Sequence, residues 1–161
     1  MSLRLLRGAL ALIALNAASV SAEPVLVTSD LAGLVRALFG DIAALSEYPA
    51  DAEVPPVFEL PQHEIEQAVC DAPCNVVAAY LPRKGIYLAG NLEPRTDAWD
   101  RAALVHELVH YLQYRERRFS ELNACERARA EEREAVEIQN AYLARVGVAR
   151  RVVMNDDFGC E

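Results

Sequence analysis

The stretch His106-Glu107-Leu108-Val109-His110 decides how this chain folds, and it contains two of the three histidines. The two histidines are four residues apart, which places both imidazoles on one face of an α-helix, one turn apart. Glu107 lies about 100° around the helix from His106, so it misses an ion held by the imidazoles but can reach a water molecule on that ion. The spacing therefore predicts a two-histidine metal site with a separate carboxylate beside it.

The residues on either side predict that this segment is an amphipathic helix. Thr96 or Asp97 supplies an N-cap, and the helix is expected to continue to about Arg115. Ala103 lies one turn before Glu107 and is small enough to leave space on the ligand face. The apolar side chains gather on the opposite side of the helical wheel, where a core would cover them: Leu104, Val105, Leu108, Tyr111 and Leu112, with Val109 at the rim. Two buried, hydrogen-bonded histidines on an ordinary helix are the competing interpretation.

A catalytic zinc ion usually has three protein ligands and one open position, so a third ligand is expected. Residues 111–116 contain neither the glycine nor the histidine of the extended HExxHxxGxxH pattern. The next candidate element is a helix from Ser120 or Asn123 to about Val146, ended by Gly147. Its expected core stripe consists of Ala124, Ala128, Ala135, Ile138, Tyr142 and Val146.

Three glutamates of that second helix are candidates for the third ligand. On the helical wheel Glu131 and Glu132 flank the core stripe, whereas Glu134 points roughly 100° away from it. An acid on the core side of a helix needs a partner, and a metal ion would serve as one.

HELVH followed about 20 residues later by an acidic helix resembles the zincin metallopeptidases of the gluzincin branch. In particular it looks like small bacterial minigluzincin-like domains, many of them functionally uncharacterised. The resemblance covers about residues 98 to 142, and in several gluzincin families a small residue stands three positions after the ligand glutamate. Glu132 with Ala135 matches that spacing, so Glu132 is the favoured third ligand, with Glu134 and Glu131 as rivals.

One position departs from the gluzincin pattern. The acidic or amide residue that often follows the small one is Val136 here. If the resemblance holds, another group must orient the metal ligands, and Gln139 on the same face is the candidate.

The resemblance implies a small zincin-like α+β domain and the hydrolysis of peptide bonds. The Zn²⁺ ion would be held by His106, His110 and Glu132, and Glu107 would act as general base on a zinc-bound water. Tyr114, one turn beyond His110, is a candidate oxyanion donor, although a packing role is the more ordinary interpretation. The competing function is a non-catalytic exported binding module in which a structural zinc joins two helices.

The segment before the HExxH helix predicts one helix followed by short elements. Apolar residues recur at helical intervals behind the capping candidates Thr28, Ser29 and Asp30. Val57–Leu60 is a possible strand, 61–69 a brief helix, and 75–81 and 86–92 two strands joined at residues 82–85. The expected helix has its apolar face at Leu31, Leu34, Val35, Leu38, Ile42 and Leu45.

His63 falls within this brief helix. The residue four positions after it is Gln67, so the segment contains no second histidine pair. We therefore expect His63 to be a surface histidine.

The first 22 residues have the pattern of a signal peptide. Arg4 and Arg7 precede an apolar run that is too short to span a membrane, and cleavage is expected after Ala22. The sequence therefore predicts an exported, periplasmic or extracellular protein, with residues 23–161 as a single domain and no membrane anchor. Cleavage removes two arginines and no acid, so the formal charge changes from −8 to −10. Nucleic acid is a poor partner for such a charge, and a peptide or protein substrate is expected.

Export makes disulfides the natural interpretation of the four cysteines. Cys70 and Cys74 bracket a tight turn that a local bridge could close, which leaves Cys125 to pair with Cys160. This is one of three possible connectivities. A cysteine metal site is disfavoured because a CxxxC pair lacks the usual CxxC spacing and a second such pair.

Overall fold

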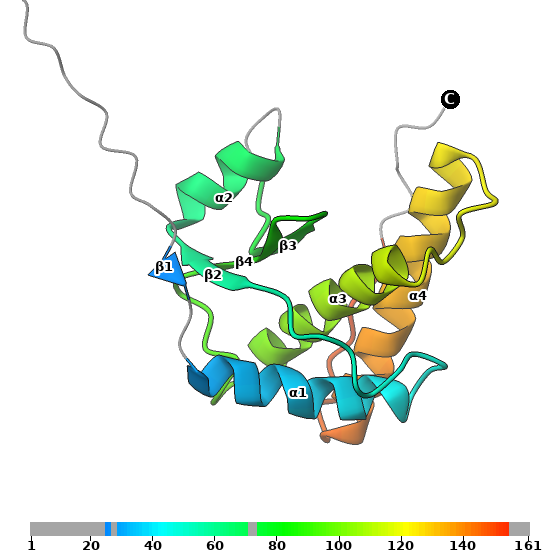
Figure 1. The fold of residues 1–161 in the computed structure, drawn as a ribbon. Coiled ribbons are helices and arrows are strands. Elements are labelled where there is room, and N and C mark those ends of the chain that lie inside the picture. The colour runs from blue at the N-terminus through cyan, green and yellow to red at the C-terminus, as the bar shows by residue number, and fades with distance from the viewer. Residues whose placement is uncertain (1–24, 27–28, 71–73, 155–161) are drawn as a thin grey trace, which may run out of the picture.

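The computed structural model describes residues 25–26, 29–70 and 74–154. Four helices and four short strands form in this part of the chain, so the predicted α+β class is confirmed (Figure 1). In chain order the elements are β1 (Val25–Leu26), α1 (Ser29–Ala43), β2 (Val57–Leu60), α2 (Gln62–Val69), β3 (Ala78–Leu81), β4 (Gly85–Ala89), α3 (Ala98–Arg115) and α4 (Ala124–Arg145). The expected signal segment, Thr28 and Cys160 lie outside the described residues.

The sheet has the strand order β1-β2-β4-β3. The predicted hairpin is present because β3 and β4 pair antiparallel, although both strands are shorter than the sequence indicated. β2 pairs parallel with β4, and α2 lies in the crossover between them. β3 therefore forms one edge of the sheet, and the structure places this edge next to α3 (Figure 1).

Alternating side chains of β4 separate two hydrophobic clusters. Ile86 and Leu88 belong to the main core, which the sheet shares with α1, α3 and α4. Ala89 packs on the other face, in a small cluster with Leu60 of β2 and Ile65 of α2. The sheet thus lies between α2 and the other three helices (Figure 1).

The two helices predicted to carry the metal ligands begin at clear caps. Asp97 accepts hydrogen bonds from the backbone N–H groups of Trp99 and Asp100 at the start of α3. Asn123 accepts one from Glu126 at the start of α4, and Gly147 after its end has φ 81°. Both predicted helices are therefore confirmed to within a few residues.

The predicted core stripe on α4 is wrong at both of its ends. Ala135, Ile138 and Tyr142 are buried as expected, but Ala124 is exposed and Val146 is 40% exposed. Both exposed residues are in or next to the terminal turns of α4, where the described part of the chain leaves them accessible. The helical period predicted the direction of the stripe but not the length over which it is covered.

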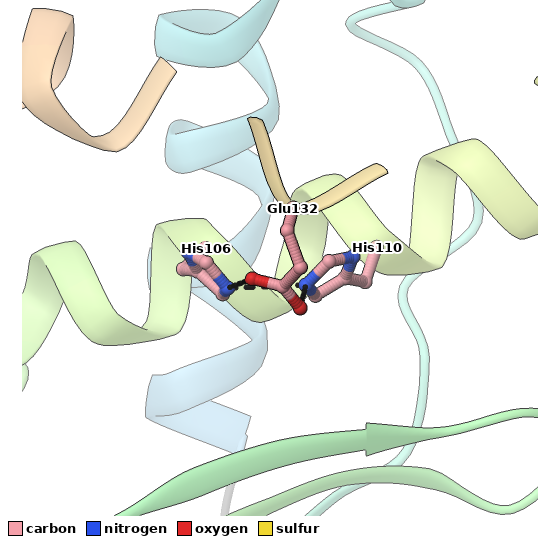
Figure 2. A group of neighbouring side chains, drawn as sticks. All are labelled: His106, His110 and Glu132. Atoms are coloured by element: carbon pink, nitrogen blue, oxygen red, sulfur yellow. Dashed lines mark hydrogen bonds and ion pairs between the residues drawn. The ribbon is translucent and has the colours of Figure 1, made fainter. Parts of the chain in front are cut away.

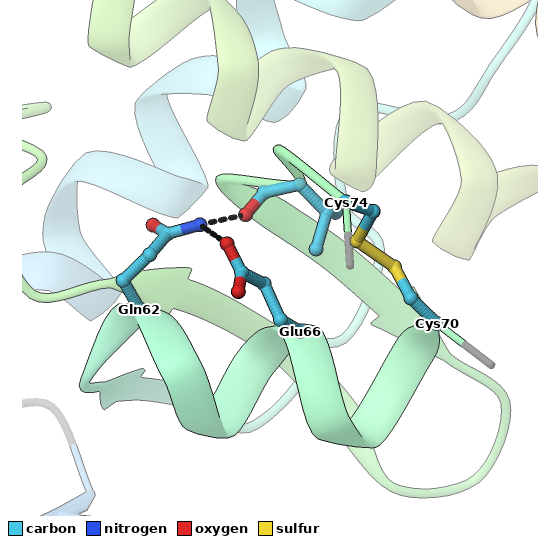
Figure 3. The surroundings of a disulfide bond; sticks show 5 residues. Gln62, Glu66, Cys70 and Cys74 are labelled. Atoms are coloured by element: carbon cyan, nitrogen blue, oxygen red, sulfur yellow. Dashed lines mark hydrogen bonds between the residues drawn. A yellow bond between two sulfur atoms is a disulfide. The ribbon is translucent and has the colours of Figure 1, made fainter. Parts of the chain in front are cut away.

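The predicted local disulfide is present between Cys70 and Cys74, whose Cα atoms are 6.4 Å apart. Next to it, the Gln62 side chain donates hydrogen bonds to the Glu66 carboxylate and to the Val76 carbonyl (Figure 3). The disulfide and the glutamine together connect α2 to the segment that leads into β3. The second predicted pairing, Cys125 with Cys160, involves a residue outside the described part of the chain.

No helix in the described part of the chain is long and apolar enough to cross a membrane.

Candidate metal centre

Two histidines and one glutamate converge between α3 and α4. The ring nitrogens Nε2 of His106 and His110 are 3.0 Å apart. The Glu132 carboxylate reaches both rings, with Oε2 3.4 Å from Nε2 of His106 and Oε1 3.1 Å from Nε2 of His110 (Figure 2). One ligand atom from each of the three residues lies within 4.8 Å of the others, so the group could hold a metal ion.

Helix packing explains why these three residues meet. The buried apolar side of α3, including Leu104, Leu108 and Leu112, fixes the rotation of that helix against the core. Ala135 of α4 is fully buried one turn after Glu132, so the glutamate faces α3. The ligand side chains remain partly accessible, with exposed fractions of 16% for His106, 17% for His110 and 38% for Glu132.

A buried amide fixes the orientation of the second imidazole. Gln113 donates hydrogen bonds from Nε2 to the backbone carbonyl of Glu131, at 2.8 Å, and to the carboxylate of Glu134, at 3.1 Å. Both partners are acceptors, so the amide nitrogen must face them, and its oxygen Oε1 must face Nδ1 of His110, 2.8 Å away. Nδ1 therefore donates a proton, which leaves Nε2 as the nitrogen that can bind a metal.

A second amide makes the corresponding contact with the first imidazole. Oε1 of Gln139, on α4, is 3.1 Å from Nδ1 of His106. Gln139 is the residue proposed from the sequence as the replacement for the missing acidic or amide group, and the structure places it in contact with His106. Both imidazoles therefore have an amide oxygen at Nδ1 and a convergent Nε2.

The donor set fits a cation. Two neutral imidazole nitrogens and one carboxylate oxygen form a combination that binds zinc in catalytic sites. With both Nδ1 atoms acting as donors, two Nε2 lone pairs and a negative carboxylate face one another, and this arrangement is repulsive without a positive charge between them. The geometry therefore calls for a bound metal ion or a proton at that point.

The raised pKa of His110 likewise indicates that a positive charge is favoured at this point. Burial lowers the pKa of His110, but the hydrogen bond to Glu132, the charge of Glu107 and the hydrogen bond to Gln113 outweigh burial and raise it to about 9. The hydrogen-bonding contacts with His106 and His110 hold the pKa of Glu132 well below its usual range. In the metal-free protein a proton on His110 thus takes the place that a metal cation would fill.

Glu107 lies beside this group and outside it. Its side chain is buried, with 8% exposure, and Oε2 accepts a hydrogen bond of 2.6 Å from the backbone N–H of Tyr80 in β3. A carboxylate has two oxygens, so Oε1 of Glu107 keeps its capacity to accept a further proton or hydrogen bond. The HExxH helix and the edge strand of the sheet are thereby connected through this carboxylate.

The two rival glutamates are not part of the group that could hold a metal. Glu134 accepts hydrogen bonds from Tyr48 at 2.5 Å and from Gln113, and it pairs with Arg118 at 3.2 Å. Glu131 lines the cleft next to Glu132, where burial raises its pKa. His63 is exposed on α2, as expected from the sequence.

A cleft of about 330 Å³ opens on the group that could hold a metal ion. It lies between the β3–β4 hairpin and α4, and its lining includes Tyr80, His110, Tyr114 and Glu132. The ring of Tyr114 is 48% exposed and stands 6.0 Å from the ring of Tyr80, centroid to centroid. The side chain of Tyr114 therefore borders the cleft, where its proposed role as an oxyanion donor stays a prediction.

Sequence reasoning missed three of the groups that support the site. Gln113 lies three residues after His110 on the same helical face, and a polar residue at that position could have been recognised as a ligand partner. Tyr48 and the backbone N–H of Tyr80 come from other segments and carry no local signal. Both contacts depend on how the loop after α1 and the strand β3 pack against α3 and α4.

The fold and the site define an α+β domain with a two-histidine, one-glutamate group that could hold a metal ion. Comparison with known proteins does not extend this description, because no protein-family model, no curated protein and no solved structure matches the chain.

Proposed function

We propose that the chain is an exported zinc-dependent metallopeptidase of the gluzincin type. The observation that carries the proposal is the convergence of His106, His110 and Glu132 with the Glu107 carboxylate held beside them. The cleft in front of this group and the neighbouring strand edge offer room for an extended peptide. The disulfide between Cys70 and Cys74 supports export, because such bonds persist in oxidising compartments.

When bound, zinc would lower the pKa of a coordinated water and polarise the carbonyl of the substrate. The residues of the chain perform the remaining work. Oε1 of Glu107 accepts a proton from the attacking water and later returns it to the amine that leaves, while the Tyr80 N–H keeps Oε2 in place. Gln113 and Gln139 hold the two imidazoles in the tautomer that directs Nε2 toward the metal.

The alternative is a binding module in which zinc joins α3 to α4 without catalysis. Structural zinc sites normally have four protein ligands and are closed to solvent. In the described residues the group has three members, and the Glu132 side chain is 38% exposed on an open cleft. This arrangement favours the catalytic proposal over the structural one.

The variant Glu107→Gln separates the two functions. It is expected to fold and to retain zinc, because the three ligands are unchanged and the side chain is nearly isosteric. It should lose activity on a broad peptide library by about a hundred- to ten-thousand-fold, because the proton acceptor is gone. Metal content by mass spectrometry and cleavage by chromatography would be measured together.

The matched control is Glu64→Gln, which removes a carboxylate on α2, away from the metal group, and should leave cleavage unchanged. The peptidase proposal fails if the wild-type protein carries zinc and cleaves nothing in the library. It also fails if Glu107→Gln cleaves as fast as the wild type.

A further inference from the structure

A second pocket lies directly beside the metal cleft. It has a volume of about 330 Å³ and is enclosed by residues 53–56, by the turn of the β3–β4 hairpin and by the last turns of α3. The rings of Tyr80 and Tyr114 line this pocket and the metal cleft alike. A peptide that lies in the cleft therefore has a neighbouring cavity within reach of its side chains.

The charge of this second pocket is opposite to that of the whole chain. Its lining contains three cations, Arg83, Lys84 and Arg115, and one carboxylate, Glu53. The formal net charge of the chain is −8. Within the described residues no carboxylate forms an ion pair with Arg83 or Lys84, so their charges are available to a ligand.

The third cation, Arg115, is positioned by a hydrogen bond to another residue of the pocket. The Tyr111 hydroxyl donates a hydrogen bond of 2.8 Å to the backbone carbonyl of Glu53 and accepts one of 3.1 Å from Nη1 of Arg115. The Glu53 carboxylate is 84% exposed and 3.9 Å from Arg115, which makes this ion pair weak. Nε of Arg115 also lies 4.0 Å from the half-exposed Glu116 carboxylate, which is another weak ion pair, so Arg115 keeps the N–H donors of Nη2 for another partner.

The hairpin turn presents the other two cations at the rim. Arg83 has φ 65°, a conformation that glycine or asparagine adopts more readily than arginine. Both Arg83 and Lys84 are exposed. The rest of the pocket lining includes Val54, Pro55 and the tyrosine rings. A pocket that combines apolar lining residues with exposed cations suits a bulky apolar group that has a carboxylate next to it.

We propose that this pocket is a specificity subsite that takes an apolar or aromatic peptide residue accompanied by a carboxylate. The inference rests on the proposed peptidase function, because it assumes that a peptide occupies the adjoining metal cleft. The carboxylate can come from a neighbouring acidic side chain or from the C-terminus of the peptide. Both sources offer the same chemistry to Arg83, Lys84 and Arg115.

Binding of dye-labelled peptides to the zinc-loaded Glu107→Gln protein, measured by fluorescence anisotropy, tests the subsite without needing turnover. Three amidated peptides share one phenylalanine and differ only in its neighbour, which is Glu, Gln or Lys. We expect the Glu peptide to bind roughly three- to tenfold more tightly than the Gln peptide, with the Lys peptide weakest. A Gln peptide with a free C-terminus tests the other source of the carboxylate. If the C-terminus is what the cations bind, this peptide binds more tightly than its amidated form.

The combined change Arg83→Gln and Lys84→Gln should remove most of this preference, and both residues are exposed, so the fold should survive. Arg36→Gln is the matched control, because Arg36 is an exposed cation on α1 outside the pocket. The subsite is refuted if Glu, Gln and Lys peptides bind equally, or if the double variant keeps the full preference. Those results would leave the peptidase proposal standing, whereas a zinc-loaded wild type that cleaves nothing would refute the peptidase alone.

Discussion

At the scale of single residues, the candidate metal centre depends on an amide that is not one of the three residues that could hold a metal ion. Gln113 is 1% exposed, and all three of its side-chain contacts are with α3 or α4. Because Glu134 and the Glu131 carbonyl can only accept, they determine which end of the amide faces His110. The tautomer of His110 is thus set by residues on the neighbouring helix.

Replacing Gln113 by methionine should weaken zinc binding while the fold persists. The thioether cannot accept the Nδ1–H of His110 with comparable strength, so the imidazole loses its orientation and affinity should fall about ten- to a hundredfold. Competition with a chromophoric chelator measures the effect. Gln67→Met, at an exposed position of α2, is the control and should bind zinc like the wild type. Equal affinities for the two variants would show that Gln113 only fills space.

At the scale of secondary-structure elements, the β3–β4 hairpin depends on one glycine. Gly85 has φ 135°, and a Cβ atom there would stand 2.5 Å from the carbonyl oxygen of Pro56. That same carbonyl accepts a hydrogen bond from the backbone N–H of Ile86. The close approach of the segment before β2 to the start of β4 therefore requires the missing side chain.

Gly85→Ala should destabilise the protein by roughly 1–3 kcal/mol, because the new methyl group collides with backbone and the φ angle is unfavourable. Gly40→Ala is the matched control: this glycine is in α1 with open space around its Cα, so alanine should be neutral or stabilise by about 0.5–1 kcal/mol. Urea unfolding of both variants provides the free energies. A Gly85→Ala protein as stable as the wild type would contradict the close approach seen here.

The elements themselves could be predicted where the signal is local. The Asp97 cap, the apolar period of α3 and Gly147 after α4 specify helix starts, faces and ends within a few residues. The parallel pairing of β2 with β4 could not be predicted, because it joins segments separated by α2 and the hairpin and depends on packing across the whole sheet. Strand β1 is only two residues long, too short for any periodicity to mark it.

At the scale of the whole molecule, the sequence predicts only some of the polar and charged residues that meet in the folded chain. The HExxH spacing placed two nitrogens on one face of α3, and the small residue at 135 favoured Glu132 over its neighbours; the structure brings these three residues together. The roles of Tyr48 and Arg118 depend on tertiary packing, since both reach Glu134 from other segments. The same applies to the cationic pocket, whose three sides come from separate parts of the chain.

The pKa shifts of His110 and Glu132 predict how the stability of the metal-free protein depends on pH. In the metal-free protein the pKa of His110 is raised from 6.5 to about 9, so the stability gained from its charged form is complete below about pH 6.5 and is lost as the pH rises through about 9. The lowered pKa of Glu132 gives a contribution that is present above about pH 4.5 and lost as the pH falls further. Metal-free stability from this pair should therefore be greatest between about pH 4.5 and 6.5.

Under the proposed function, any zinc ion that binds this group must displace the proton from His110, so metal binding and protonation oppose each other. Apparent zinc affinity should continue to rise with pH above 7 and level off near pH 9, instead of levelling off near 6.5 as for an ordinary histidine ligand. Competition titrations in metal-free buffers across this range would show it. In Glu132→Gln the hydrogen-bonded negative charge is lost, and the rise should end at lower pH. A wild-type curve that is flat above pH 7 would be incompatible with the coupled pair.

The hydrogen bond from Tyr80 to Glu107 also occupies one backbone N–H on the outer side of the edge strand β3, while the carbonyl of the same residue is not used by this bond. In an antiparallel pair, alternate residues direct both backbone groups away from the neighbouring strand, and on β3 these are Ala78 and Tyr80. The amide proton of Tyr80 is already donated to the Glu107 carboxylate. A peptide aligned on this edge would find the carbonyl of Tyr80 facing it and would have to compete with Glu107 for the N–H. Replacing the peptide bond whose carbonyl would face the Tyr80 N–H by an ester, which makes that carbonyl a weaker acceptor, should therefore reduce peptide affinity little. Methylating the peptide nitrogen that faces the Tyr80 carbonyl removes a hydrogen bond and should reduce the affinity clearly.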